Sequence, residues 1–306
     1  MKHAEIEALV KGFVVDTAKR EADPRVQQVV LRLATDLFKA IEDLDLSPSE
    51  VWKGIEYLSE AGATQELGLL AAGIGLERFL DIRMDEADAK AGLTGATPRT
   101  IEGPLYVAGA PESEGFARLD DGSDEGKGEL LFMQGTVFDV DGRPLPGAQV
   151  EVWHANVLGN YSFFDKTQSA FNLRRTIITD SSGRYQFRSI VPVGYGCPPE
   201  GTTQRLLDKL GRHGQRPAHI HFFISAPAHR KLTTQINIDG DEYLWDDFAF
   251  ASREGLVPKV ERITSAGQLK QHGVDQPFAS IDFDFRLNAE SAAAPDVDVD
   301  RLRAAA

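Results

Sequence analysis

The sequence predicts a mainly β chain in which an antiparallel β-sandwich core follows an N-terminal helical domain. Two observations predict this class. Apolar residues recur with a helical period through roughly the first ninety residues. After Leu130 they alternate with polar residues in short runs that turn residues separate. The length of 306 residues and the apolar fraction of 42% suit one large or two modest globular domains.

Composition limits the class of function. Lys and Arg number 33 against 47 Asp and Glu, so the net charge of −14 argues against binding to nucleic acid or an anionic membrane. The single cysteine, Cys197, excludes a disulfide framework and a cysteine-only metal site. No apolar run approaches the length of a membrane span, and no targeting segment is visible. We therefore expect a cytoplasmic protein that acts on a small molecule.

Residues 1–96 are expected to form the helical domain. The first two helices follow from apolar residues at helical spacing, between Ile6 and Val14 and between Pro24 and Ile41. The stretch Ser47-Pro48-Ser49-Glu50 marks the start of a third helix. These apolar faces would pack either on the rest of the chain or on a second copy.

A fourth helical stretch is expected between Gln65 and Arg83. It is strongly apolar, but three glycines disfavour a single unbroken helix: Gly68, Gly73 and Gly75.

Residues 97–290 are expected to form the sandwich domain, and residues 291–306 a surface tail. TPRTIEGPLYVAGAP is rich in Pro and Gly and predicts an extended connector, and SEGFARLDDGSDEGKGE predicts a polar loop. LLFMQGTVFDVDGRPLPGAQVEVWHAN predicts two strands around an Asp-Gly/Pro turn, and RRTIITDSSGRYQFRSIVPV another hairpin around Ser-Gly. AHIHFFISA and TTQINI predict further strands. FASIDFDFRL predicts a half-buried strand whose apolar side consists of Ile281, Phe283, Phe285 and Leu287.

The most informative short motif is His219-Ile220-His221 on a predicted strand. Side chains at positions i and i+2 of a strand point to the same side, so the two imidazoles would face one point. Ile220 and Phe222 would then lie on the opposite, apolar side. The pair predicts either a bidentate metal platform or two polar histidines on a hydrated sheet face.

The remaining ligands decide which metal would bind. One carboxylate beside two histidines would suggest Fe(II), but Asp165, Asp180 and Asp239 lie in turn sequences. Tyr161 and Tyr195 lie in or beside glycine-containing turns from which they can reach inward, whereas Tyr185 in an alternating strand is expected to pack. Two tyrosinates with two imidazoles would favour Fe(III), because a highly charged cation supplies the driving force for deprotonation.

Five stretches resemble those of the intradiol ring-cleavage dioxygenases, and in particular of the catechol 1,2-dioxygenase branch. They are TPRTIEGPLYVAGAP, GRPLPGAQVEVWHAN, GYGCPPEG, GRHGQRPAHIHFFISA and HRKLTTQIN. The resemblance implies a mononuclear non-haem Fe(III) with a solvent hydroxide and four protein ligands, which are Tyr161, Tyr195, His219 and His221. Tyr195 and His221 would be axial. Tyr195 would also take a proton from the substrate, and Arg216 and Gln235 would act beside it.

The resemblance further implies the activity. Catechol and dioxygen would be converted to cis,cis-muconate in aromatic-compound degradation (the β-ketoadipate pathway). The pocket wall would consist of Leu69, Ala72, Ile101, Pro104, Phe248 and Ala249. Tyr106 is a weaker candidate for substrate contact. At Ala72 some members of the family carry proline, which leaves the preference for substrate size open.

The resemblance also implies a homodimer joined through the N-terminal helices, with an apolar tunnel between them that can hold a lipid. Two alternatives stay open at this point. The first is an intradiol enzyme that acts on chlorocatechols or hydroxyquinol. The second is a non-catalytic β-sandwich binding module, because GTVFDVDGRPLPGAQVEVW and TDSSGRYQF also resemble transthyretin-like and carboxypeptidase regulatory-like domains.

Overall fold

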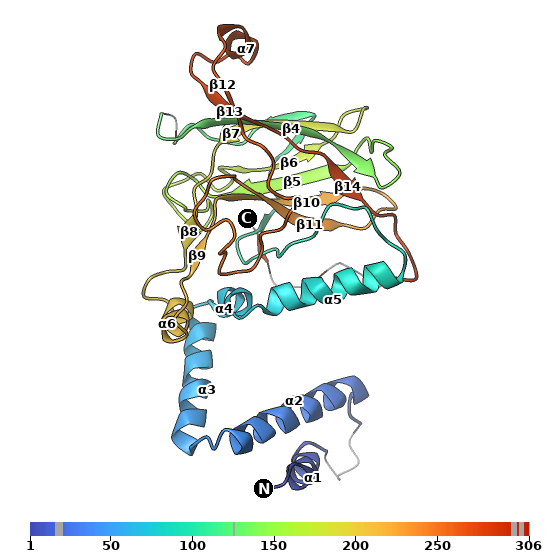
Figure 1. Cartoon of the computed structure of the whole chain (residues 1–306), viewed down its shortest axis with the longest axis vertical. Coiled ribbons are helices and arrows are strands. Elements are labelled where there is room, and N and C mark those ends of the chain that lie inside the picture. The colour runs from blue at the N-terminus through green and yellow to red at the C-terminus, as the bar shows by residue number, and fades with distance from the viewer. Residues whose placement is uncertain (16–20, 125, 295–298, 300–302, 306) are drawn as a thin grey trace. The chain divides into compact units, whose positions relative to one another are not determined.

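The structure of the chain is a computed structural model that describes residues 1–15, 21–124, 126–294, 299 and 303–305. The chain forms two compact units, Met1–Thr64 and Gln65–Ala306. The first unit is helical. The second contains the sheets and the remaining helices (Figure 1).

The first unit contains α1 (His3–Val14), α2 (Pro24–Asp43) and α3 (Pro48–Ala63). The Asp23 carboxylate caps α2 by accepting hydrogen bonds from two backbone N–H groups of its first turn. Ser47 and Glu50 form a reciprocal capping box at the start of α3. The three predicted helices are confirmed. Among helices in the described ranges, none combines the length and apolar character that crossing a membrane requires.

Both longer helices of the first unit carry large apolar side chains that remain exposed. On α2 and α3 these are Val26, Val29, Val30, Leu33, Leu37, Phe38, Trp52, Ile55 and Leu58. So many exposed apolar side chains on two helices are typical of a protein–protein contact surface.

The fourth helical stretch is divided into α4 (Leu67–Gly73) and α5 (Leu76–Lys90). Gly75 separates them with a φ of +79°, a backbone conformation that favours glycine. The prediction that the glycines interrupt this stretch is thus confirmed. α5 continues to Lys90, past the predicted end at Arg83. In the second unit α5 lies along the β10–β11 side of the sandwich (Figure 1).

The second unit is a sandwich of two sheets. One sheet has the strand order β11-β10-β5-β6-β2 and the other β12-β13-β4-β7-β3, with β14 also paired to β4. The strands are β2 (Glu112–Glu114), β3 (Phe116–Arg118), β4 (Leu130–Asp139), β5 (Gln149–His154), β6 (Arg174–Ile178), β7 (Arg184–Ile190), β10 (His219–Ser225), β11 (Leu232–Asn237), β12 (Glu261–Ile263), β13 (Phe278–Asp282) and β14 (Phe285–Leu287).

The pairing confirms the fold class and shows that the sheets are mixed. The central pairs are antiparallel, as predicted, and they join β5 to both β6 and β10 and join β4 to β7. Four pairs are parallel. β2 pairs with β6, β3 pairs with β7, and both β13 and β14 pair with β4.

The predicted hairpins are wrong. β4 and β5 flank the Asp-Gly/Pro turn, and β6 and β7 flank the Ser-Gly turn, but the two strands of each pair lie in different sheets. The chain does turn tightly, since the Asp180 N–H donates to the Arg184 carbonyl at 3.0 Å. Beyond the turn the strands diverge, because each one buries its apolar side against the opposite sheet.

FASIDFDFRL forms two strands rather than one. β13 ends at Asp282, β14 begins at Phe285, and both pair with β4. The predicted alternation is confirmed, because Ile281, Phe285 and Leu287 are buried, Phe283 is half-buried against the core, and Asp282, Asp284 and Arg286 are exposed. Between the strands the Phe283 backbone lies against β4, where Gly135 leaves room for it.

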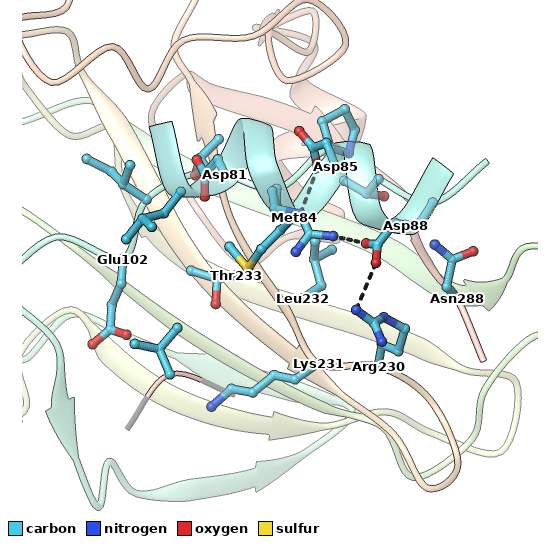
Figure 2. A pocket seen from close by; sticks show the side chains of 18 of the residues that line it. Asp81, Met84, Asp85, Asp88, Glu102, Arg230, Lys231, Leu232, Thr233 and Asn288 are labelled. Carbon is cyan, nitrogen blue, oxygen red and sulfur yellow. Dashed lines mark hydrogen bonds and ion pairs between the residues drawn. The ribbon is translucent and has the colours of Figure 1, made fainter. Parts of the chain in front are cut away.

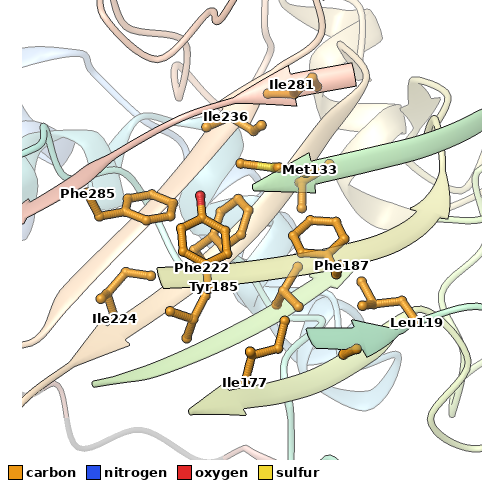
Figure 3. Close-up of a cluster of buried hydrophobic side chains, with 14 of the residues drawn as sticks. Leu119, Met133, Ile177, Tyr185, Phe187, Phe222, Ile224, Ile236, Ile281 and Phe285 are labelled. Atoms are coloured by element: carbon orange, nitrogen blue, oxygen red, sulfur yellow. The ribbon is translucent and has the colours of Figure 1, made fainter. Parts of the chain in front are cut away.

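The core lies between the two sheets and contains large aromatic and aliphatic side chains from both (Figure 3). Phe187 and Phe222 contact each other across it, from β7 and β10. Tyr185 is fully buried, as expected, and its hydroxyl donates to the Phe283 carbonyl at 2.7 Å. Each such side chain contributes about 1.5–3 kcal/mol of burial free energy, which makes the sandwich a rigid support for residues on its strands.

Several short elements were not predicted. The helices α6 (Thr202–Lys209) and α7 (Ala266–Gln271) lie in segments without an assigned pattern, as does the pair β8 (Tyr195–Gly196) and β9 (Gln215–Arg216). The predicted polar loop contains β3 and the last two residues of β2. Of the predicted tail, residues 295–298, 300–302 and 306 lie outside the described residues, while β15 (Ala304–Ala305) pairs with β1 (Val107–Ala108).

A cavity of about 510 Å³ lies beside α5 within the second unit (Figure 2). Its wall contains buried ion pairs, in which Asp88 accepts from Arg230 at 2.9 Å and also pairs with Arg99. Of the predicted pocket residues, Ile101 lines this cavity. The predicted metal ligands do not, so the cavity and the candidate metal centre are distinct.

Candidate metal centre

The two histidines of the short motif lie on β10, an inner strand of one sheet between β11 and β5. His219 faces Asn237 of β11, and His221 faces Gln235 of β11 and Trp153 of β5. Both histidines are 1% exposed, and their Nε2 atoms lie 3.0 Å apart. Ile220 and Phe222 point into the core, as the alternation along the strand predicted. The alternative of a hydrated sheet face is therefore excluded.

Both predicted loop tyrosines reach the same point. The Tyr161 hydroxyl lies 3.4 Å from the Tyr195 hydroxyl, which lies 3.5 Å from His219 Nε2. Gly159 has a φ of +79°, and a Cβ there would lie 2.8 Å from the Cβ of Tyr195. A glycine at this position thus lets the loop that carries Tyr161 approach Tyr195. The structure brings together two phenol oxygens and two imidazole nitrogens from three separate segments.

The imidazoles are held in different ways. His219 Nδ1 lies 2.6 Å from the Pro217 carbonyl oxygen, so this nitrogen carries the proton and Nε2, which faces the tyrosines, carries the lone pair. The His221 ring stacks on the Trp153 indole, with an interplanar angle of 5° and centroids 4.9 Å apart. Two buried Nε2 atoms face each other here, and a shared cation would bind both lone pairs.

Burial dominates the electrostatics of the two histidines and of Tyr161. It lowers the pKa of His219 to about 3, with the positive charge of Arg216 acting in the same direction, and it lowers the pKa of His221 well below its usual value. The imidazoles are thus neutral, which is the form that binds metals. Burial raises the pKa of the Tyr161 phenol well above 10, so a metal bound through this oxygen must displace its proton.

The candidate carboxylates do not join the site. Asp165 and Asp180 accept hydrogen bonds from backbone N–H groups of their own turns, and Asp239 is exposed. Across the described residues, no three or more His, Cys, Asp or Glu side chains lie close enough together to hold a metal ion. The donors that lie beside the two histidines are instead the hydroxyls of Tyr161 and Tyr195.

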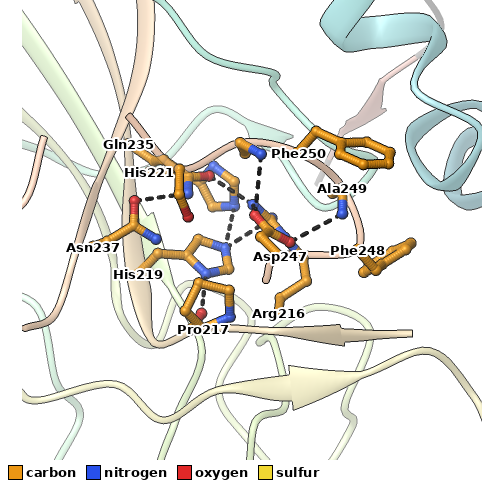
Figure 4. Close-up of polar contacts among 12 residues, drawn as sticks. Arg216, Pro217, His219, His221, Gln235, Asn237, Asp247, Phe248, Ala249 and Phe250 are labelled. Carbon is orange, nitrogen blue, oxygen red and sulfur yellow. Dashed lines mark hydrogen bonds and ion pairs between the residues drawn. The ribbon is translucent and has the colours of Figure 1, made fainter. Parts of the chain in front are cut away.

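Arg216 lies beside the four groups on β9, which pairs with Tyr195 of β8. Its Nη1 lies 2.9 Å from His219 Nε2, and its Nη2 donates to Gln235 Oε1 at 2.8 Å (Figure 4). Both Arg216 and Gln235 are buried. A guanidinium that faces the shared point can stabilise negative charge that develops there.

Five of the seven predicted pocket residues meet in one apolar cluster. It joins α4, the extended connector and the loop after β11, and these residues are Leu69, Ala72, Ile101, Phe248 and Ala249. Pro104 is half-buried, and it follows Gly103, where a Cβ would lie 3.9 Å from the His221 ring. The connector thus passes close to the metal ligands.

Tyr106 lies outside this cluster. Its ring packs on Trp153 and Phe223, and its hydroxyl donates to Glu151 Oε1 at 2.5 Å. The structure therefore places Tyr106 behind the stacked His221–Trp153 pair rather than among the other predicted wall residues.

Two residues of the site were missed as functional candidates. Asp247 pairs with Arg216 through two hydrogen bonds, and Trp153 supports His221. Trp153 lies in VEVWHAN, part of a stretch that carried the family resemblance. On a strand its side chain points away from the face of Val152, and this alternation could have identified it. Asp247 lies in LWDDFAF without periodicity or a turn pattern, so no local signal identifies it.

Comparisons with known proteins find relatives over nearly the whole chain. A family model described as "Dioxygenase" matches residues 101–289, and one described as "Catechol dioxygenase N terminus" matches residues 23–92. The catechol 1,2-dioxygenase of Acinetobacter guillouiae is 60% identical over 96% of this chain and 97% of its own length. The crystal structure of wild-type catechol 1,2-dioxygenase from Acinetobacter radioresistens has a TM-score of 0.98 and 64% identity, and covers 100% of this chain and 99% of that one. The hydroxyquinol 1,2-dioxygenase of a Rhizobium species is 34% identical over 87% of this chain and 90% of its own length.

Proposed function

This chain belongs to the catechol dioxygenase family, and we propose that it uses dioxygen and one ferric ion to cleave catechol between its two hydroxylated carbons. The product is cis,cis-muconate. The observation that carries the proposal is that two phenol oxygens and two imidazole nitrogens meet at one buried point. A non-catalytic sandwich module would have no use for this arrangement.

The donor set fits Fe(III). Phenolate oxygens favour a hard, highly charged cation, and such a cation offsets the raised pKa of a buried phenol. When bound, Fe(III) would take both oxygens of catechol and make the ring reactive toward dioxygen. The protein ligands would be Tyr161, Tyr195, His219 and His221.

The residues around this point have separate tasks. Catechol must lose two protons to bind as a dianion. Tyr195 can accept one of them, and the solvent hydroxide that the resemblance implies at the metal would accept the other. The resemblance to the family assigns Tyr195 as the phenol that gives way to the substrate, and its greater exposure supports this, since Tyr161 is 4% exposed and Tyr195 half-buried. Arg216, held by Gln235, places a permanent positive charge beside the bound anion.

The apolar cluster of α4, the connector and the loop after β11 forms the substrate wall in this proposal. It excludes water, which strengthens every charge interaction inside the site. Pro104 continues this wall toward His221. Tyr106 does not touch the substrate in this scheme; it supports the His221–Trp153 stack from behind.

Catechol is favoured over hydroxyquinol and chlorocatechols as the substrate. The sequence identity to the catechol 1,2-dioxygenase of Acinetobacter guillouiae is 60%, whereas that to the hydroxyquinol 1,2-dioxygenase of the Rhizobium species is 34%. Turnover of catechol, a chlorocatechol and hydroxyquinol under identical conditions decides the matter. We expect the highest kcat/KM with catechol, and a clear preference for hydroxyquinol would overturn the substrate assignment.

A homodimer through the N-terminal helices, with a lipid held in an apolar tunnel between them, is part of the proposal. The apolar side chains of α2 and α3 support it, since they are exposed in the single chain and a second copy would bury them. The proposed cytoplasmic location rests on the single cysteine of the sequence.

Oxygen uptake with catechol, measured together with the iron content, tests the proposed function. We expect consumption of one dioxygen per catechol by protein that contains about one iron per chain, with muconate as the product. Iron-replete protein that consumes no oxygen with catechol would contradict the proposal.

A further inference from the structure

Asp247 holds the guanidinium of Arg216 from one side. Its carboxylate oxygens accept from Arg216 Nε at 3.2 Å and from Nη2 at 3.1 Å (Figure 4). The Arg216 side chain is 4% exposed and the Asp247 side chain 1%. The pair is therefore a two-point, desolvated ion pair, which fixes both the position and the plane of the guanidinium.

This pairing decides which nitrogen of Arg216 faces the metal ligands. Asp247 occupies Nε and Nη2, and Gln235 takes a further hydrogen bond from Nη2. Only Nη1 is left to point at the shared site, where it lies 2.9 Å from His219 Nε2. Without the carboxylate, Gln235 alone would hold the guanidinium at one nitrogen, and its plane could rotate.

The same carboxylate organises part of the substrate wall. Oδ1 accepts from the backbone N–H of Ala249 at 3.0 Å, and Oδ2 accepts from that of Ala251 at 3.2 Å. Phe248 lies between Asp247 and Ala249 in the chain, and its own N–H donates to the Gln215 carbonyl at 3.1 Å. The loop that carries Phe248 and Ala249 is thus fastened to the strand that carries Arg216.

We propose that Asp247 is a positioning residue for ring cleavage, which aims Arg216 Nη1 at the bound substrate and fixes the adjoining wall. This inference rests on the proposed function of the site. A buried arginine that must stay beside a reacting anion needs a fixed partner, because a small displacement of a charge removes much of its effect on the reaction. Asp247 makes no contact with the metal ligands themselves in this role, so iron binding does not depend on it.

The test uses the iron-loaded, full-length chain with Asp247→Asn. Asparagine keeps the shape but offers one acceptor where the arginine needs two. We expect iron content and the visible tyrosinate absorption to stay unchanged, while kcat falls by about tenfold or more and KM changes little. The matched control is Asp88→Asn, which breaks a buried pair with Arg230 away from the site. Its thermal midpoint should fall while its kcat stays at the level of the unsubstituted chain.

A double-substitution cycle separates positioning from a structural role. In an Arg216→Gln background, Asp247→Asn should lower kcat by a much smaller factor, because the group that it aims is gone and only its contacts with the wall loop remain. The proposal is overturned if Asp247→Asn leaves kcat unchanged, or if it lowers kcat by the same factor in both backgrounds. Failure of the proposed function looks different, since the unsubstituted chain itself would then not cleave catechol.

Discussion

Tyr161 and Tyr185 are both buried tyrosines, yet only one has a hydroxyl that faces other ligand groups. The Tyr161 hydroxyl faces that of Tyr195, whereas the Tyr185 hydroxyl donates to a backbone carbonyl in the core. Tyr161→Phe should therefore weaken iron binding, reduce the tyrosinate-to-iron absorption and abolish ring cleavage. Visible spectra and metal analysis of the purified variants measure this.

Tyr185→Phe is the matched control for this substitution. It removes the same oxygen, so it should cost about 1 kcal/mol of stability and leave the iron and its colour intact. A Tyr161→Phe protein that keeps full iron content and activity would remove Tyr161 from the ligand set.

His154 makes stability depend on pH. It is fully buried, its Nε2 contacts the Ser189 hydroxyl at 2.7 Å, and burial lowers its pKa to about 4. Between the ordinary pKa of about 6.5 and this value, the unfolded chain binds a proton here and the folded chain does not. The unfolding free energy contributed by His154 should therefore fall by about 1.4 kcal/mol for each unit by which the pH is lowered through this range.

Denaturant titrations at several pH values measure this dependence. His154→Gln should be less stable at pH 7, but its unfolding free energy should fall less steeply between about pH 6.5 and pH 4. An unchanged slope in the variant would show that His154 does not titrate as described.

At the scale of single residues, the sequence identified the candidate ligands but missed two residues that hold the site in place, Trp153 and Asp247. The His219–His221 spacing predicted a shared face because strand geometry is local. The two tyrosines followed from loop position and family resemblance. Asp247 lies thirty-one positions after Arg216, and nothing in its local sequence indicates that contact, which depends on how the loop after β11 folds back.

At the scale of elements, the join between β13 and β14 depends on one glycine. A Cβ at Gly135 would lie 1.7 Å from the Phe283 carbonyl oxygen, which belongs to the backbone and cannot move aside cheaply. Gly135→Ala should therefore lower the unfolding free energy by about 3 kcal/mol. Thermal or denaturant unfolding measures the change.

Gly267 supplies the control for that prediction. It lies in α7 with nothing within 4 Å of its Cβ position, so Gly267→Ala should change stability by less than about 1 kcal/mol. Equal effects of the two substitutions would contradict the close approach at Gly135.

Periodicity predicted most of the longer elements, because helix and strand patterns are written in neighbouring residues. It failed on pairing. β4 and β5 look like a hairpin along the chain, as do β6 and β7, but each buries its apolar face against the opposite sheet. Which sheet a strand joins depends on contacts between distant residues, and a turn signal does not contain that information.

At the scale of the whole molecule, the exposed apolar surface of the first unit should be an interface between two copies. The double substitution Leu33→Glu with Leu37→Glu places charges on α2 where two apolar side chains are more than half exposed. Sedimentation equilibrium should show a dimer for the unsubstituted chain and mostly monomer for the variant.

Gln28→Glu is the control for this variant, since it adds one charge to an exposed polar position of the same helix. It should remain dimeric. A monomeric unsubstituted chain would end the proposal of a homodimer, and with it the lipid tunnel.

The central claim is that one ferric ion is bound between four side chains of this chain. Diffraction from crystals of the unsubstituted protein, recorded on both sides of the iron absorption edge, tests it most directly. We expect a single anomalous peak per chain, within coordination distance of the hydroxyls of Tyr161 and Tyr195 and of the Nε2 atoms of both histidines. A peak elsewhere, or a metal at that point whose absorption edge is that of zinc, would contradict the account.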